Sequence, residues 1–172
     1  MTKESELHLG GLNGYLNCLS RLCGPRYAFN VNMFEANADV EAFITTKIEE
    51  WKVGDEDCPG TEYKYSGKFE IGFNEICDRL AEYIFNGLLQ KAIRPNSTVY
   101  EQYKRVLIED INEYYGLIST ALNCDGVFHP LIRGPVFEIS LTSEEREHIF
   151  CFLVKIESYY VLSIFSKRDG AV

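Results

Sequence analysis

The chain has 172 residues, of which 46% are apolar, 13% aromatic and 25% charged, and its formal charge at pH 7 is −9. A chain of this length and composition can bury a sizeable core, so we expect one globular domain over residues 1–172 rather than a disordered polypeptide. The acidic balance argues against nucleic acid and anionic membranes as partners, because both are bound through clustered Lys and Arg side chains.

Two helices are predicted in the first third of the chain, over residues 12–22 and 38–51. In the second, four apolar residues recur at helical spacing, which places them on one face. They are Val40, Phe43, Ile44 and Ile48. The stretch between residues 52 and 68 is too polar and too rich in glycine for a helix, so we expect a long loop there. Such loops in compact domains are more often functional or disordered than simple connectors.

Two more helices are predicted over residues 69–88 and from Ser97 or Thr98 to Ala121, and their short connection favours an antiparallel pair. Residues 125–140 contain Pro130, Gly134 and Pro135 and read as an irregular crossover, with room for a short β-hairpin near residues 127–140.

A fifth helix is predicted near the C-terminus, where Thr142 and Glu145 have the spacing of a capping box. Its apolar positions keep helical spacing. They are Ile149, Phe152, Leu153, Ile156, Tyr160 and Ile164. Residues 159–165 are also rich in β-branched and aromatic side chains, which is typical of a strand, but we favour a helix. The predicted fold class is therefore mainly α, a single-domain bundle of five helices with a long acidic loop.

Most of the net charge lies between residues 35 and 62. Nine acids in this segment are opposed by Lys47 and Lys52 alone, which gives the segment a charge of −7. The acids are Glu35, Asp39, Glu41, Glu49, Glu50, Asp55, Glu56, Asp57 and Glu62. Asp55–Asp57 lacks the bidentate acid that would complete a calcium loop, because Ser66 stands at the twelfth position. We therefore interpret the segment as a solvated acidic surface.

The chemical motifs in the chain do not combine into a catalytic or metal site. Glu145 and His148 form a single Glu-x-x-His, whereas carboxylate metal bundles use two. His148 and Cys151 are three residues apart on the predicted C-terminal helix, but Cys151 stands among apolar residues and is better explained as a buried small hydrophobe. We predict no catalytic residue, no metal and no cofactor, and we expect a protein that is not an enzyme.

No apolar run is long enough to cross a bilayer, and the first ten residues lack the apolar core of a secretory signal. We therefore expect a cytoplasmic protein. In a reducing compartment its six cysteines would be free thiols.

The functional hypothesis is a protein-binding module. Tyrosine and tryptophan dominate binding hot spots, and surrounding acids steer a basic partner. The predicted partner-binding residues are Glu49, Glu50, Trp51, Asp55, Glu56, Asp57, Glu62, Tyr63 and Tyr65. The most concrete version is an immunity-type inhibitor that covers the basic cleft of a toxin such as a nuclease. The alternatives are a small helical enzyme or ligand-binding domain that uses His129 or His148, and an adaptor subunit of a larger assembly.

Overall fold

The computed structural model describes residues 2–24, 27–53, 63–88, 98–122, 135–143 and 147–168. These residues form an α/β fold with four helices and a five-stranded antiparallel sheet. The helices are α1 (Lys3–Cys23), α2 (Val40–Val53), α3 (Phe73–Leu88) and α4 (Thr98–Leu122). The strands are β1 (Tyr27–Glu35), β2 (Tyr63–Ile71), β3 (Val136–Ser143), β4 (Glu147–Ile156) and β5 (Tyr159–Arg168). The prediction of a mainly α, five-helix bundle is wrong.

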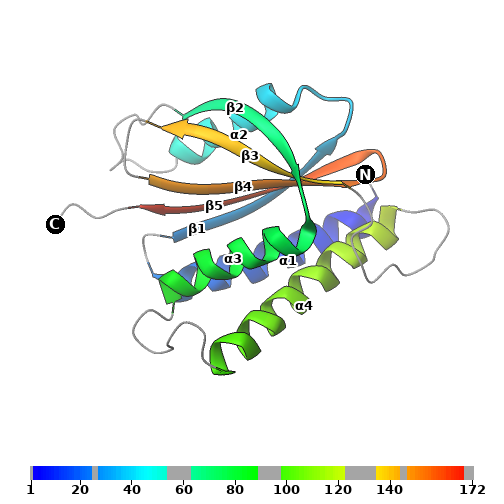
Figure 1. The fold of residues 1–172 in the computed structure, drawn as a ribbon. Coiled ribbons are helices and arrows are strands. Elements are labelled where there is room, and N and C mark those ends of the chain that lie inside the picture. Colours follow the sequence, from blue (N-terminus) through cyan, green and yellow to red (C-terminus); the bar gives the residue numbers. More distant parts are fainter. Residues whose placement is uncertain are drawn as a thin grey trace.

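The sheet separates two unequal helical layers. Its strand order is β1-β5-β4-β3-β2, so β1 and β2 are the edges. In Figure 1, α2 lies on one side of the sheet and α1, α3 and α4 lie on the other. We call these sides the α2 face and the three-helix face.

The predicted C-terminal helix is instead the β4–β5 hairpin. Phe150, Phe152 and Val154 belong to or pack on the core of the three-helix face, whereas Cys151 and Leu153 belong to the core of the α2 face. Because both faces are covered, the middle of this strand, residues 149–154, is apolar throughout, and the alternation that marks a half-exposed strand disappears there. The remaining apolar run also matches helical spacing, which explains the error.

The sequence interpretation also missed β1 and placed β2 partly in a loop and partly in a helix. In β2, the pairing register with β3 shifts between Tyr65 and Gly67, and Gly67 has a φ of +152°, a conformation that side chains rarely adopt. A Cβ added at Gly67 would lie 3.5 Å from the ring of Phe69. Gly67 and the bulge allow this segment to form a strand, although its composition resembles that of a loop.

The other four helix predictions are right in kind. Helix α4 begins at Thr98 as expected, while α1 extends further toward the N-terminus than predicted because Thr2 and Ser5 form a capping box. Helices α3 and α4 are antiparallel neighbours, as the paired contacts Phe85–Tyr100 and Asp78–Lys104 demonstrate, the second an ion pair of 2.7 Å. The predicted acidic helix corresponds to α2. The hairpin predicted near residues 127–140 falls mostly on residues 123–134, which lie outside the described part, and its described end belongs to β3.

The core of the three-helix face is aromatic and contains one polar pair. Phe152 stacks on Phe165 with ring centroids 5.8 Å apart, and Tyr115 of α4 packs against Phe152. The hydroxyl of Tyr115 lies 2.6 Å from the hydroxyl of Ser163, and both residues are buried. Each hydroxyl therefore has a partner despite its burial.

The core of the α2 face depends on residues from the first half of α2. Ile44 is fully buried, and the ring of Phe43 stacks on Phe34 of β1 with centroids 3.9 Å apart. Tyr160 of β5 packs against Phe34 and Phe137. These contacts dock α2 on the sheet and fix where its charged residues lie.

The edge of β1 is closed by a single side chain of α1. The amide of Asn13 accepts a hydrogen bond from the backbone N–H of Val31 (3.0 Å) and donates one to the carbonyl of Val31 (3.1 Å). An unpaired edge can pair with another chain, so Asn13 substitutes for a sixth strand at this position.

Candidate functional site: an acidic corner between helix α2 and strand β2

The structure places part of the predicted partner-binding set on two adjacent elements. Glu49, Glu50 and Trp51 lie on α2, and Tyr63 and Tyr65 lie on β2, which contacts α2. The side chains of Glu49, Trp51 and Tyr63 lie outside the described part, as do all atoms of Asp55, Glu56, Asp57 and Glu62. The predicted residues therefore lie on two elements that contact each other, although the prediction treated the second element as a loop.

Two acidic residues near the start of α2 lie close to Tyr65. Burial, and then the negative charges of Glu41 and Asp39, raise the pKa of the Tyr65 hydroxyl above its usual range. Asp39 also caps the helix, because its carboxylate accepts the backbone N–H of Ala42 at 3.1 Å. Glu35 ends β1 just before this turn. We call Glu35, Asp39, Glu41 and Tyr65 the acidic corner.

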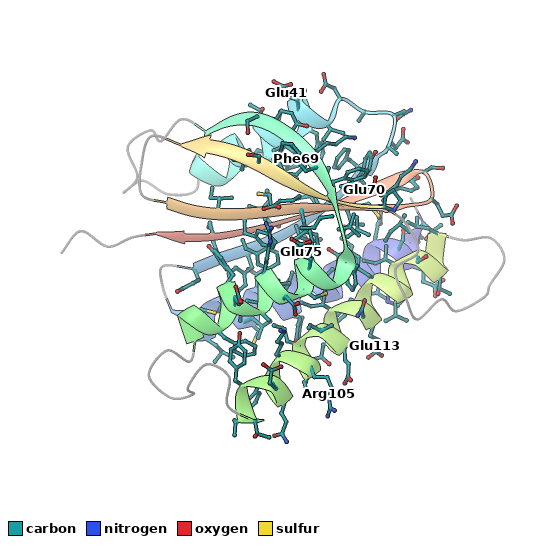
Figure 2. The ribbon with its side chains drawn as sticks, viewed as in Figure 1. Glu41, Phe69, Glu70, Glu75, Arg105 and Glu113 are labelled. Atoms are coloured by element: carbon teal, nitrogen blue, oxygen red, sulfur yellow. The ribbon has the colours of Figure 1, made fainter. Side chains whose placement is uncertain are left out.

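The carboxylates of the acidic corner are not neutralised by the cations that the structure describes. None of the three forms an ion pair with a described residue. Figure 2 shows Glu41 at the end of the molecule remote from Arg105. Glu50 differs from them, because Lys47 pairs with it at 2.6 Å.

The lysines on this face lie over aromatic rings. The Lys68 ammonium lies 4.8 Å from the ring centroid of Phe137 and 5.4 Å from that of Tyr160, and the Lys47 ammonium lies 5.6 Å from that of Phe43. Cation–π attraction of this kind contributes about 0.5–1 kcal/mol at exposed sites. It draws each ammonium group toward an aromatic ring, and neither lysine forms an ion pair with Asp39 or Glu41.

A surface hollow adjoins the acidic corner at the end of β1. It has a volume of 540 Å³. Its lining residues are Glu35, Ala36, Asn37, Lys155, Glu157, Ser158 and Tyr159. The backbone N–H of Ala36 donates to the carbonyl of Ser158 (2.8 Å), which ties the turn after β1 to the β4–β5 turn. Sequence reasoning missed Glu157 and Tyr159 because it placed them inside a helix.

The rejected chemical motifs gain no support from the fold. His148 and Cys151 both belong to strand β4, so the helical spacing that paired them in the sequence prediction does not apply. Cys151 is buried, and burial raises the pKa of its thiol. Glu145 and His129 lie outside the described residues. Across the described ranges, no group of three His, Cys, Asp or Glu side chains is placed to hold a metal ion.

Four cysteines are free thiols, as expected: Cys18, Cys23, Cys77 and Cys151. Cys58 and Cys124 lie outside the described residues. Within the described part, no helix is long and apolar enough to cross a membrane.

Comparison with protein-family models, curated proteins and solved structures gives no match for this chain.

Proposed function

We propose that this protein is an acidic protein-binding module that binds and neutralises a basic protein partner. The observation that supports the proposal is the acidic corner, where Asp39 and Glu41 stand beside Tyr65 without an ion pair to a described residue. An exposed carboxylate attracts a basic surface over several ångströms and accelerates encounter, while a tyrosine supplies contact area at low entropic cost. The combination favours a partner with a basic surface.

An immunity-type inhibitor is the most concrete form of this function. The cleft of a nuclease toxin is basic because it holds nucleic-acid phosphates. Carboxylates carried on a docked helix can occupy those phosphate positions, and the acids of residues 55–62 extend the same charged segment along the chain. Binding at the cleft would then exclude the substrate and neutralise the toxin.

The test begins with tagged protein in a lysate of its native cell, at low and moderate salt. We expect one stoichiometric basic protein that is released as salt rises, and whose nuclease activity falls when this protein is added back at equal amount. Recovery of the tagged chain alone, or of a partner that is acidic and insensitive to salt, contradicts the proposal.

A charge-matched pair of variants locates the surface. Asp39→Asn with Glu41→Gln removes two negative charges and keeps an N-cap, because asparagine caps helices as well as aspartate does. Glu4→Gln with Glu6→Gln removes two charges from the exposed start of α1 and serves as the control. We expect the first pair to slow association about tenfold and to reduce its salt dependence, and the second to change it little. Equal effects would remove the acidic corner from the interface.

A further inference from the structure

A second hollow lies on the opposite side of the sheet, between α1 and α4. Its volume is 310 Å³, at the lower end of the usual range for ligand pockets. It is lined by Tyr15, Asp110, Glu113, Tyr114 and Leu117. We call it the α1–α4 hollow. It shares no residue with the acidic corner, and an inference about it does not rest on the proposed function.

Two aromatic rings line one part of this hollow. The rings of Tyr15 and Tyr114 are 5.7 Å apart between centroids and tilted by 39°. Tyr114 can approach α1 because Gly11 lies beneath it, and a Cβ there would be 3.0 Å from the tyrosine ring. Glycine in a helix costs about 1 kcal/mol relative to alanine, so this close approach of ring to helix accounts for its presence at that position.

Two carboxylates line another part. Asp110 and Glu113 are three residues apart on α4 and therefore lie on neighbouring positions of one helical face. The Tyr15 hydroxyl donates a hydrogen bond of 2.8 Å to Oδ2 of Asp110, which fixes that carboxylate in the hollow. Neither carboxylate forms an ion pair with any residue that the structure describes. Glu113 points outward from α4 in Figure 2.

The Tyr15 hydroxyl remains a donor at neutral pH. Burial, and then its hydrogen bond to Asp110 and the charge of that carboxylate, raise the pKa of Tyr15. The hydroxyl is therefore neutral, and the negative charge at the rim comes from Asp110 and Glu113. Anionic ligands are repelled from such a site, while a cation meets two carboxylates and two electron-rich rings.

We infer that the α1–α4 hollow binds an alkylammonium group. The ammonium would lie between the Asp110 and Glu113 carboxylates and the Tyr15 and Tyr114 rings, with its methylene chain along Leu117. Free polyamines and the lysine side chains of proteins both carry this group. Aromatic faces recognise quaternary ammonium ligands in proteins, and they attract a lysine ammonium in the same way.

The test uses the full chain at 150 mM salt, where weak nonspecific attraction is screened. Spermidine, N-acetyl-lysine methylamide and its uncharged isostere N-acetyl-norleucine methylamide are each titrated, with binding followed by amide chemical shifts. We expect saturable binding of the two ammonium probes, with shifts centred on the residues around Tyr15 and Tyr114, and none with the norleucine probe. Tighter binding of spermidine identifies a free polyamine as the ligand, and equal binding of the two identifies a lysine side chain.

Variants separate the contributions of charge and ring. Asp110→Asn with Glu113→Gln keeps the shape and the acceptor for Tyr15, and we expect it to weaken binding about tenfold. Tyr114→Leu removes one ring and keeps an apolar side chain, and we expect it to weaken binding severalfold. Asp39→Asn with Glu41→Gln should leave binding unchanged, which separates this site from the acidic corner. Binding of the norleucine probe, absence of saturation, or an unchanged affinity in Asp110→Asn with Glu113→Gln overturns the inference.

Discussion

The two faces of the sheet differ in how much core they bury. Among the described residues, nineteen buried side chains form the core of the three-helix face and eight form the core of the α2 face. Buried apolar area is the main favourable term in folding, so the three-helix face supplies most of the stability. The α2 face binds one helix and displays that helix's acids. Stability therefore rests mainly on the three-helix face, while the α2 face carries the acidic corner.

The largest expected effect tests the three-helix face. Phe152→Ala removes a ring that is 1% exposed and that packs on Phe165, Phe150 and Tyr115. We expect the free energy of unfolding to fall by about 3–5 kcal/mol, because transfer and cavity terms add. Urea denaturation followed by circular dichroism measures the loss. The control is Phe69→Ala, the same substitution at a ring that is 60% exposed, for which we expect less than about 1 kcal/mol. Similar losses of stability in Phe152→Ala and Phe69→Ala would contradict the conclusion that the core of the three-helix face supplies most of the stability.

The next effect tests the α2 face. Ile44→Ala removes a fully buried side chain of α2, and we expect a loss of about 2–4 kcal/mol. Because few contacts hold this helix, we also expect its amides to exchange hydrogen faster while those of α1 and α4 remain protected. Native-state hydrogen exchange makes the measurement. Uniform acceleration across all helices would mean that the two faces unfold as one cooperative unit.

A smaller effect concerns Asn13 of α1, which caps the edge strand β1 at Val31. Asn13→Ala leaves the N–H and C=O of Val31 without their partner, and we expect a loss of about 1–3 kcal/mol. The exposed edge should also increase self-association, which light scattering detects. Asn17→Ala, on an exposed position of the same helix, is the control and should leave stability within about 0.5 kcal/mol. If both variants behave alike, the edge of β1 needs no cap.

How far the sequence predicts this fold depends on exposure. Helices α3 and α4 were predictable because each has a solvent-exposed face, which preserves the helical periodicity of its apolar residues. Strands β4 and β5 were not, because their burial on both faces removes the alternation. The Glu157–Ser158 pair between two apolar runs was the available signal of a hairpin.

Strand β1 carried a signal that was missed. Tyr27, Phe29, Val31 and Met33 alternate with smaller or polar residues, as expected for one apolar face of a strand. The acidic corner was predictable in part, because charge density along the chain identifies the segment. The proximity of Tyr65 to Glu41 was not, because it depends on β2 being a strand at the sheet edge beside α2. The α1–α4 hollow depends on residues about one hundred positions apart and left no local pattern.

The buried thiol of Cys77 makes the stability of the three-helix face depend on pH. Burial raises the pKa of Cys77, on the three-helix face, to about 12 from an ordinary value near 9. The thiol is neutral in both states below pH 9, and above it the unfolded chain loses its proton first. Stability therefore declines as the pH rises from 9 toward 12, by about 1 kcal/mol for this thiol between pH 9 and 10. Urea unfolding at pH 8, 9 and 10 should show a shallower decline in Cys77→Ala, and parallel slopes would exclude this thiol as a cause.

The smallest effect concerns a carboxylate of the acidic corner and a carboxylate that is paired. Glu41 is exposed and forms no ion pair with a described residue, so Glu41→Gln should change the free energy of unfolding by less than about 0.5 kcal/mol. Glu138 of β3 accepts two hydrogen bonds from Arg79, of 2.6 and 2.7 Å, and Glu138→Gln should cost about 0.5–1 kcal/mol. Thermal unfolding of the two variants measures this difference. If Glu41→Gln proves the more destabilising, then Glu41 supports the fold, and its role in the acidic corner must be reassigned from partner attraction to structure.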